Sequence, residues 1–295
     1  MTHLRIARWL ILLCAFAVGL ACAGRRSAIA PPETTPTVAP AVTAAEIADL
    51  FADAEGHWAE RLDPDPAREA LRLYQTLATL VPDDVHLQTR LVRAHYYVAN
   101  FIEEDAMARD ALFLQAIEEG ERALARNPAF GQAFARHDDV RAALRSATPD
   151  QVGLVMWTGA SLAKWVASKG LLVRLKHKSI LEAYFQRVRE LDDDYYYGAT
   201  FRFFGALPTK VPGGDLAQSR AQFEEGVRRF PDFFGTRLLF AELYATKAQD
   251  PETFRAQLQY VIDAPANAIP EVTPENTLEQ RRAQALLARY GELFE

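Results

Sequence analysis

Apolar residues recur along most of the chain at the three- and four-residue spacing of amphipathic helices, and capping signals open one such run after another. Thr43, with Glu46 three residues later, has the pattern of a capping box. Four further positions pair an N-capping side chain with a proline suited to a first helical turn: Asp65-Pro66, Thr148-Pro149, Asp250-Pro251 and Thr273-Pro274. No stretch shows sustained period-two alternation. The pattern predicts an all-α domain over residues 43–295, with about twelve antiparallel helices.

Several of the predicted helices share one spacing, in which a small residue is followed by an aromatic residue, a small or apolar residue and a proline. The three examples are Ala70-Tyr74-Leu77-Pro82, Ala116-Gly120-Ala123-Pro128 and Ser219-Phe223-Gly226-Pro231. This spacing resembles the second helix of a tetratricopeptide repeat, and Pro231 and Pro265 lie one 34-residue period apart. The first-helix signature is missing nearly everywhere, so the repeats are degenerate. Because one hairpin cannot bury its apolar face alone, we expect a tetratricopeptide-like solenoid of helical hairpins.

The stretch from Asp192 to Pro231 is predicted to be one such hairpin, with an unusually aromatic first helix. On a helical wheel its aromatic side chains cover an arc of roughly 160°, whereas a surface helix needs a stripe of about 100°. We therefore expect this helix to be covered on more than one side. Pro208 is expected to end it, and a turn and N-cap then follow at Pro212, Gly213, Gly214 and Asp215.

The segment from Thr148 to Gly170 is predicted to be a buried central helix. It carries no charge between Val152 and Ala163, and this apolar run is too short to cross a bilayer. Trp157 and Trp165 would lie within about 80° of each other on its surface. The small residues Gly159, Ala160 and Ala163 would let another helix come close, and Gly170 suits a C-cap.

The first residues have the pattern of a bacterial signal peptide over residues 1–21. Arg5 and Arg8 precede an apolar run that stops at Cys22 and is too short to span a membrane. The pair Ala21-Cys22 resembles a lipoprotein cleavage site, in which the cysteine becomes acylated. Gly19 and Leu20 depart from the usual order, so ordinary secretion remains the alternative.

Residues 22–42 are rich in Pro, Thr and Ala, which predicts a lipid anchor at Cys22 followed by a flexible tether. Ala23 after the cysteine resembles lipoproteins sent to the outer membrane. The expected location is thus the periplasm, with the lipid anchor as the only contact with the membrane. Cys14 is the other cysteine and lies within the signal peptide, so the mature chain has no intramolecular disulfide to form.

Charge and motifs narrow the functional classes. The formal net charge is −6, with acidic and basic residues interleaved and no basic block, which argues against a nucleic-acid partner. None of the six histidines has the spacing of a zinc protease site, and the acidic runs Asp138-Asp139 and Asp192-Asp193-Asp194 lack the spaced ligands of a calcium loop. No nucleophile elbow, phosphate loop or dinucleotide motif occurs. We therefore expect no catalytic residues, no metal and no cofactor.

Aromatic residues of the two central helices are the remaining candidates for a site. They are Trp157, Trp165, Tyr195, Tyr196, Tyr197, Phe203 and Phe204. One interpretation is ordinary packing between repeats. The other is a ligand tunnel or cleft, because each aromatic side chain has roughly 150–250 Å² to bury and such crowding is typical of a helix facing an apolar cavity.

The run from Tyr195 to Ala245 resembles the T-component family of TRAP transporters, which are periplasmic tetratricopeptide-like lipoproteins. The matching motifs are Tyr195 to Gly198, Gly205, Pro212 to Asp215, Phe223-Glu224, and Ala241-Glu242 with Tyr244. The likeness extends over most of Thr43 to Phe294. Ala199 to Phe204 is more aromatic than the usual run in this family, which would narrow or fill a tunnel.

The resemblance implies a non-enzymatic accessory subunit that docks with the periplasmic solute-binding protein of a TRAP transporter. It also implies a homotrimer with an apolar tunnel through each protomer. The alternative function is a general tetratricopeptide scaffold for envelope or outer-membrane assembly, in which the aromatic residues serve only as core.

Overall fold

The computed structural model describes residues 42–294, and every regular element in this range is a helix. The longer helices are α1 (Ala44–Ala59), α2 (Pro64–Leu80), α3 (Val85–Tyr97), α4 (Ala106–Ala125), α5 (Pro128–His137), α7 (Val152–Ala167), α8 (Leu171–Leu191), α9 (Tyr195–Lys210), α10 (Leu216–Arg229), α13 (Pro251–Asp263) and α14 (Thr273–Ala288). The shorter elements are η1 (Val98–Ile102), α6 (Val140–Leu144), η2 (Pro149–Gln151), α11 (Phe234–Leu239), η3 (Phe240–Ala245), α12 (Thr246–Ala248), η4 (Ala266–Ala268), η5 (Pro270–Val272) and α15 (Tyr290–Leu293). The all-α prediction is confirmed. The expected signal peptide, Cys22 and nearly all of the tether lie outside the described residues.

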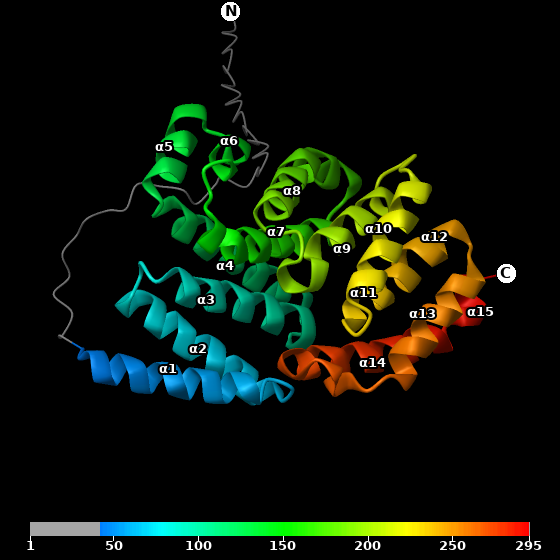
Figure 1. The fold of residues 1–295 in the computed structure, drawn as a ribbon, viewed down its shortest axis with the longest axis horizontal. Coiled ribbons are helices and arrows are strands. Elements are labelled where there is room, and N and C mark those ends of the chain that lie inside the picture. The colour runs from blue at the N-terminus through cyan, green and yellow to red at the C-terminus, as the bar shows by residue number, and fades with distance from the viewer. Residues whose placement is uncertain (1–41, 295) are drawn as a thin grey trace, which may run out of the picture.

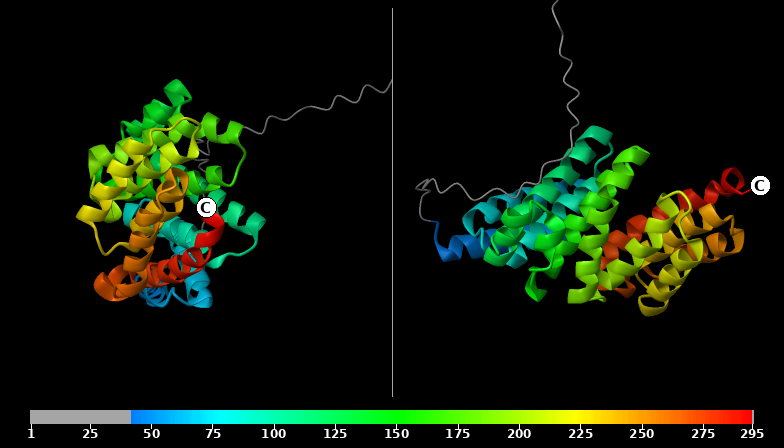
Figure 2. Two further views of the ribbon diagram at one scale, coloured as in Figure 1. Left: turned by 90° about the vertical axis from the view of Figure 1, so that its right-hand side faces the viewer. Right: turned by 90° about the horizontal axis from the view of Figure 1, so that it is seen from above.

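Helices that follow one another in the chain also pack against one another (Figure 1). The first group runs from α1 to α8, and the second runs from α9 to α15. The chain then returns, because α14 brings its first turn beside the end of α1, where Glu275 forms an ion pair with Arg61. The view from above, on the right of Figure 2, shows the same division into an N-terminal and a C-terminal group. The space between the two groups becomes the functional candidate below.

Three of the five predicted capping signals begin helices as expected: Thr148 caps η2, which leads into α7, and Thr43 and Asp250 cap α1 and α13. Thr273, in contrast, lies inside α14, and Val272 is the N-cap there. Thr43 and Glu46 form a reciprocal capping box at α1, and Asp250 Oδ1 accepts a hydrogen bond from the Thr253 amide at α13. The prediction at Asp65 is wrong, because α2 begins earlier and Asp63 is its N-cap. The sequence Asp63-Pro64-Asp65-Pro66 offers the same cap in two registers, and the earlier one adds two residues to the helix.

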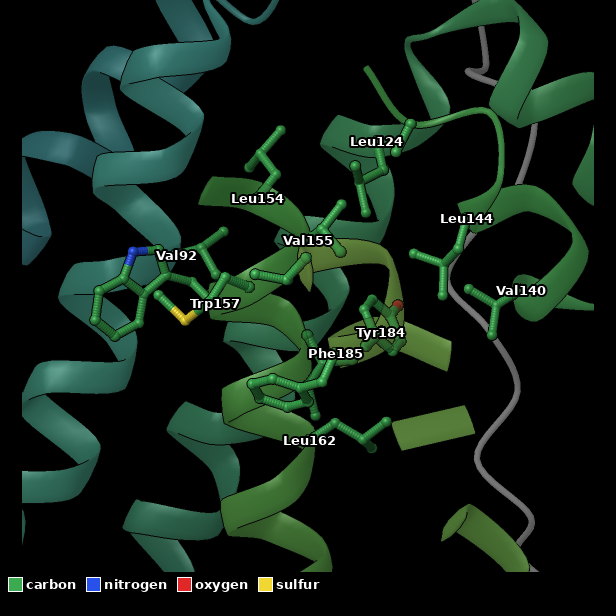
Figure 3. Packing of buried hydrophobic residues seen from close by; sticks show 14 of the residues in the cluster. Val92, Leu124, Val140, Leu144, Leu154, Val155, Trp157, Leu162, Tyr184 and Phe185 are labelled. Carbon is green, nitrogen blue, oxygen red and sulfur yellow. The ribbon is translucent and has the colours of Figure 1, made fainter. Parts of the chain in front are cut away.

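The predicted buried central helix is α7, whose residues Leu154, Val155 and Leu162 are fully buried. Figure 3 shows their side chains packed with those of Tyr184 and Phe185 from α8. At Gly159 a Cβ atom would lie 2.9 Å from the Tyr184 Cβ, so glycine is what allows α7 and α8 to approach.

Gly170 does not cap the end of α7 as predicted. Ser168 is the C-cap of α7, and Gly170 instead precedes α8 as its N-cap, in an extended conformation. The amides of Val173 and Arg174 both donate to the Gly170 carbonyl oxygen, so α8 begins immediately.

The continuous aromatic helix expected from Tyr195 is wrong at its start. Tyr196, Tyr197 and Gly198 have φ angles of +46°, +55° and +65°, so three successive residues adopt the left-handed conformation before the right-handed part of α9 begins. A wheel drawn at about 100° per residue therefore misplaces the tyrosines relative to the phenylalanines that follow.

Pro208 does not end α9 either. The helix continues to Lys210, because a proline this close to the C-terminal end removes little of the backbone hydrogen-bond ladder. In the turn that follows, Gly213 has a φ of +69°, and a Cβ at Gly214 would lie 2.0 Å from the Pro208 carbonyl oxygen. Asp215 Oδ1 then accepts from the Gln218 amide, 3.0 Å away, and begins α10.

Candidate functional site

A cavity of about 350 Å³ lies between the two groups of helices. Its lining comes from η1, α7 and α8 of the first group and from α9, α11, η3 and α14 of the second, with α3 contributing Tyr96. This volume falls within the roughly 300–1,000 Å³ of small-molecule pockets. The site is thus assembled from helices that are distant in the chain.

Three of the seven candidate aromatic residues line this cavity, namely Trp157, Tyr196 and Phe203. Their rings belong to two separate groups: the Trp157 and Tyr196 centroids are 4.5 Å apart, and Phe203 stacks on Phe185 at 3.9 Å. Tyr96, Phe185 and Phe233 also line it and were not among the candidates. Only helix packing across long sequence separations brings these residues into the same wall.

The other four candidates do not line the cavity. Trp165 packs edge-on against His177, and Tyr197 stacks on Phe233 with a centroid distance of 5.1 Å. Phe204 lies under the Arg189 guanidinium, 4.3 Å from its ring centroid. Tyr195 approaches α7, where a Cβ at Gly153 would lie 2.5 Å from its hydroxyl. These four side chains contribute packing around the site rather than its surface.

The left-handed turn at the start of α9 is held by Arg202. Its Nη2 donates to the Tyr196 carbonyl oxygen at 2.7 Å, and its Nη1 donates to that of Tyr197 at 2.5 Å. The guanidinium also lies 4.3 Å from the centroid of Phe233. Burial lowers the pKa of Arg202 to about 10, so the side chain remains charged at neutral pH.

Gly198 is required in the same turn. Besides its positive φ, a Cβ there would lie 2.7 Å from Phe201 Cδ2 and 2.8 Å from Phe230 Cε2. The tyrosine run followed by glycine therefore encodes a left-handed turn that brings the Tyr196 ring against Trp157.

One group of buried charges joins the N-terminal helices to α14, and we call Arg61, Arg93 and Glu275 the Glu275 cluster. Arg61 Nη2 lies 2.8 Å from Glu275 Oε2, and Arg93 Nη2 lies 3.1 Å from Oε1. The Arg93 guanidinium lies over Tyr196 at 5.0 Å and over Trp157 at 5.5 Å. Both oxygens of the carboxylate thus bind guanidinium groups, one from the turn after α1 and one from α3.

A second group of charges faces the cavity. Lys164, the only charged residue of α7, lines it and has no hydrogen bond or ion pair within residues 42–294. Burial, reinforced by Arg282, lowers the pKa of Lys164 to about 8, against the opposing effect of Glu279 and Glu242. Glu279 pairs with Arg282 at 3.1 Å, and burial raises the pKa of its carboxyl group. A lone lysine in an otherwise uncharged helix was the sequence signal for this site.

Within residues 42–294, no three His, Cys, Asp or Glu side chains are grouped closely enough to hold a metal ion. In the same range, no helix has the length and apolar character needed to span a membrane.

Comparison with known families gives one match. A family model described as TRAP transporter T-component matches residues 65–294, which is well over half of the chain. This family is a transporter component rather than a family of enzymes. A comparison with curated proteins gives no significant match.

Proposed function

Because the chain belongs to the TRAP transporter T-component family, we propose that it is a non-enzymatic accessory subunit that docks with a periplasmic solute-binding protein and passes an apolar ligand. The observation that carries the ligand part is the cavity of about 350 Å³ with its aromatic wall. A protein whose aromatic residues served only as core would have no reason to keep such a space, because cavities cost stability. The helical hairpins would act as a tetratricopeptide-like solenoid that forms this wall.

Exposed leucines support a docking face beside the cavity. At the start of α8, Leu172 is 82% exposed, and Leu171 and Leu175 are about half exposed. At about 100° per residue, Leu171 and Leu175 adjoin the stripe of α8 that carries the cavity residues Arg174 and Lys178. An apolar ligand would then pass from the cavity to a partner that covers these leucines without being exposed to water.

The remaining parts of the proposal concern assembly and location. Residues 1–21 would direct export, Cys22 would be acylated, and the segment to residue 42 would tether the domain to the outer membrane on its periplasmic side. The resemblance to the family also supports a homotrimer. Native mass spectrometry of the purified mature chain tests the trimer directly, and a monomer at micromolar concentration contradicts it.

The docking proposal is tested by mixing the mature protein with the solute-binding protein encoded beside it. We expect a complex at micromolar concentrations by native mass spectrometry and at least a tenfold weaker complex for Leu172→Glu, because a charge would have to be buried in the interface. Val42→Glu, at an exposed apolar position before α1, is the control and should leave the affinity unchanged. No complex with the wild-type chain would overturn the docking proposal and favour the general scaffold.

A further inference from the structure

The cavity is positively charged in a chain that is negatively charged overall. Six cationic side chains line it, and only three carboxylates do so. The whole chain, in contrast, has a formal net charge of −6. The positive character is therefore local to the cavity lining rather than a reflection of composition.

The carboxylates of the lining are already largely engaged by other cations. Glu275 is occupied by Arg61 and Arg93, and Glu279 is paired with Arg282. Glu242 is the third carboxylate, and it has no ion pair within the described part of the chain. The protein thus supplies little negative charge to balance the remaining cations.

The cations differ in how far their donors are used. Two nitrogens of Arg202 donate hydrogen bonds to carbonyl oxygens of the left-handed turn. Lys178 forms an ion pair with Glu182 at 2.5 Å. Arg174 donates its Nε to the Lys169 carbonyl oxygen. Lys164 and Lys210 donate to none of the residues 42–294, and Lys164 is the one charged residue of the apolar helix α7. The Lys164 side chain is half-buried in the cavity lining, and the three N–H donors of its ammonium group are free for a ligand.

We propose that the cavity binds an amphipathic monoanion, with a carboxylate at the Lys164 ammonium group and an apolar body against Trp157, Phe185 and Phe203. This inference rests on the proposed ligand-handling function and adds the chemical class of the ligand. The aromatic wall provides apolar contact, and the ammonium group provides a charge-assisted hydrogen bond. Such a pairing selects a carboxylic acid over a neutral molecule of the same shape.

The volume sets the size of the ligand. If each non-hydrogen atom occupies roughly the 30 Å³ of one liquid water molecule, the cavity holds about a dozen such atoms. Decanoate has this size, and decanamide has the same shape and number of heavy atoms without the charge. The pair therefore separates the headgroup from the apolar body.

The test is isothermal titration calorimetry of the mature chain with decanoate and with decanamide at pH 7. We expect decanoate to bind about 10- to 100-fold more tightly, as one charge-assisted hydrogen bond allows. Lys164→Met should reduce the affinity for decanoate to that for decanamide and leave decanamide binding unchanged. Lys176→Met is the matched control, because it removes an exposed charge of α8 outside the cavity lining. Lys164→Gln, checked for folding by circular dichroism, serves if the methionine variant does not fold.

The outcomes distinguish a failure of the carboxylate site at Lys164 from a failure of the cavity as a ligand site. Equal affinity for the two probes, or an unchanged affinity for decanoate in Lys164→Met, overturns the carboxylate site and leaves an apolar passage intact. Binding of neither probe overturns the cavity as a ligand site, and with it the ligand part of the proposed function, whereas docking is measured independently. An equal loss in Lys176→Met would assign the effect to overall charge and overturn the role of Lys164.

Discussion

The Glu275 cluster and the Lys164 side of the cavity both contain charged side chains that are buried or half-buried, but they differ in their partners. In the Glu275 cluster, one carboxylate binds two guanidinium groups at 2.8 and 3.1 Å. On α7, Lys164 has no carboxylate partner within residues 42–294. Tyr196 lies between the two regions, because its ring contacts both Arg93 and Trp157 and also lines the cavity.

This difference indicates whether a charged side chain serves the structure or the binding of a ligand. A charge whose partners are all supplied by the protein holds helices together, and its removal should lower the free energy of unfolding. A charge that the protein leaves without a partner lowers stability, and it is retained for a contact that the protein alone does not make. Variants of each region should therefore change the free energy of unfolding in opposite directions.

The largest effect is expected from Glu275→Gln. This change leaves Arg61 and Arg93 buried without their carboxylate, which typically costs about 3–5 kcal/mol. Urea denaturation measures the loss. Glu292→Gln is the control, because it removes an exposed carboxylate paired with Arg289 and should cost less than about 1 kcal/mol. Similar losses in the two variants would contradict a structural role for the Glu275 cluster.

A smaller loss is expected from Gly198→Ala, which acts on the turn that connects the two regions. The added Cβ combines a positive φ with overlap against Phe201 and Phe230, so we expect a loss of about 2–4 kcal/mol. Gly213→Ala separates the two causes, because Gly213 has a similar φ of +69° but open space around its Cβ position. Gly213→Ala should lower the free energy of unfolding by only about 1–2 kcal/mol. An equal loss in both variants would show that crowding around the turn does not matter.

The smallest effect has the opposite sign. Lys164→Met should raise the free energy of unfolding at pH 7 by about 1–3 kcal/mol, because it removes a charge that burial disfavours. Since the pKa of Lys164 is about 8 in the folded protein and about 10.4 in the unfolded chain, the wild type gains stability as pH rises through this window. The advantage of the variant should therefore shrink between pH 8 and 10.5 in urea titrations. Lys176→Met should stay within about 0.5 kcal/mol of wild type at each pH, and a destabilised Lys164→Met would contradict the assignment.

Sequence patterns were sufficient for the helices but not for the site. The uncharged run of α7 and the caps at Thr43 and Asp250 predict their helices because these signals are local. The left-handed turn was missed, because three residues including two tyrosines rarely take positive φ together and an Arg202 side chain is needed to hold them.

The cavity depends on contacts between distant segments. Trp157, Tyr196 and Phe203 could be singled out as aromatic, but which of the seven candidates face a space is decided by α3, α11 and α14. Lys164 was passed over, because a single lysine carries no motif. Its meaning comes from its place in the cavity lining without an ion pair, a three-dimensional property of the described residues.

The central claim is that the cavity holds an amphipathic anion with its headgroup at Lys164. A crystal structure of the mature chain with 10-bromodecanoate tests it most directly, because anomalous scattering locates the bromine and the electron density locates the carboxylate. The predicted result is bromine between the two groups of helices, near Phe185 or Phe203, and the carboxylate within about 3 Å of Lys164 Nζ. Bromine found only on the protein surface, or a carboxylate bound away from Lys164, would contradict the account.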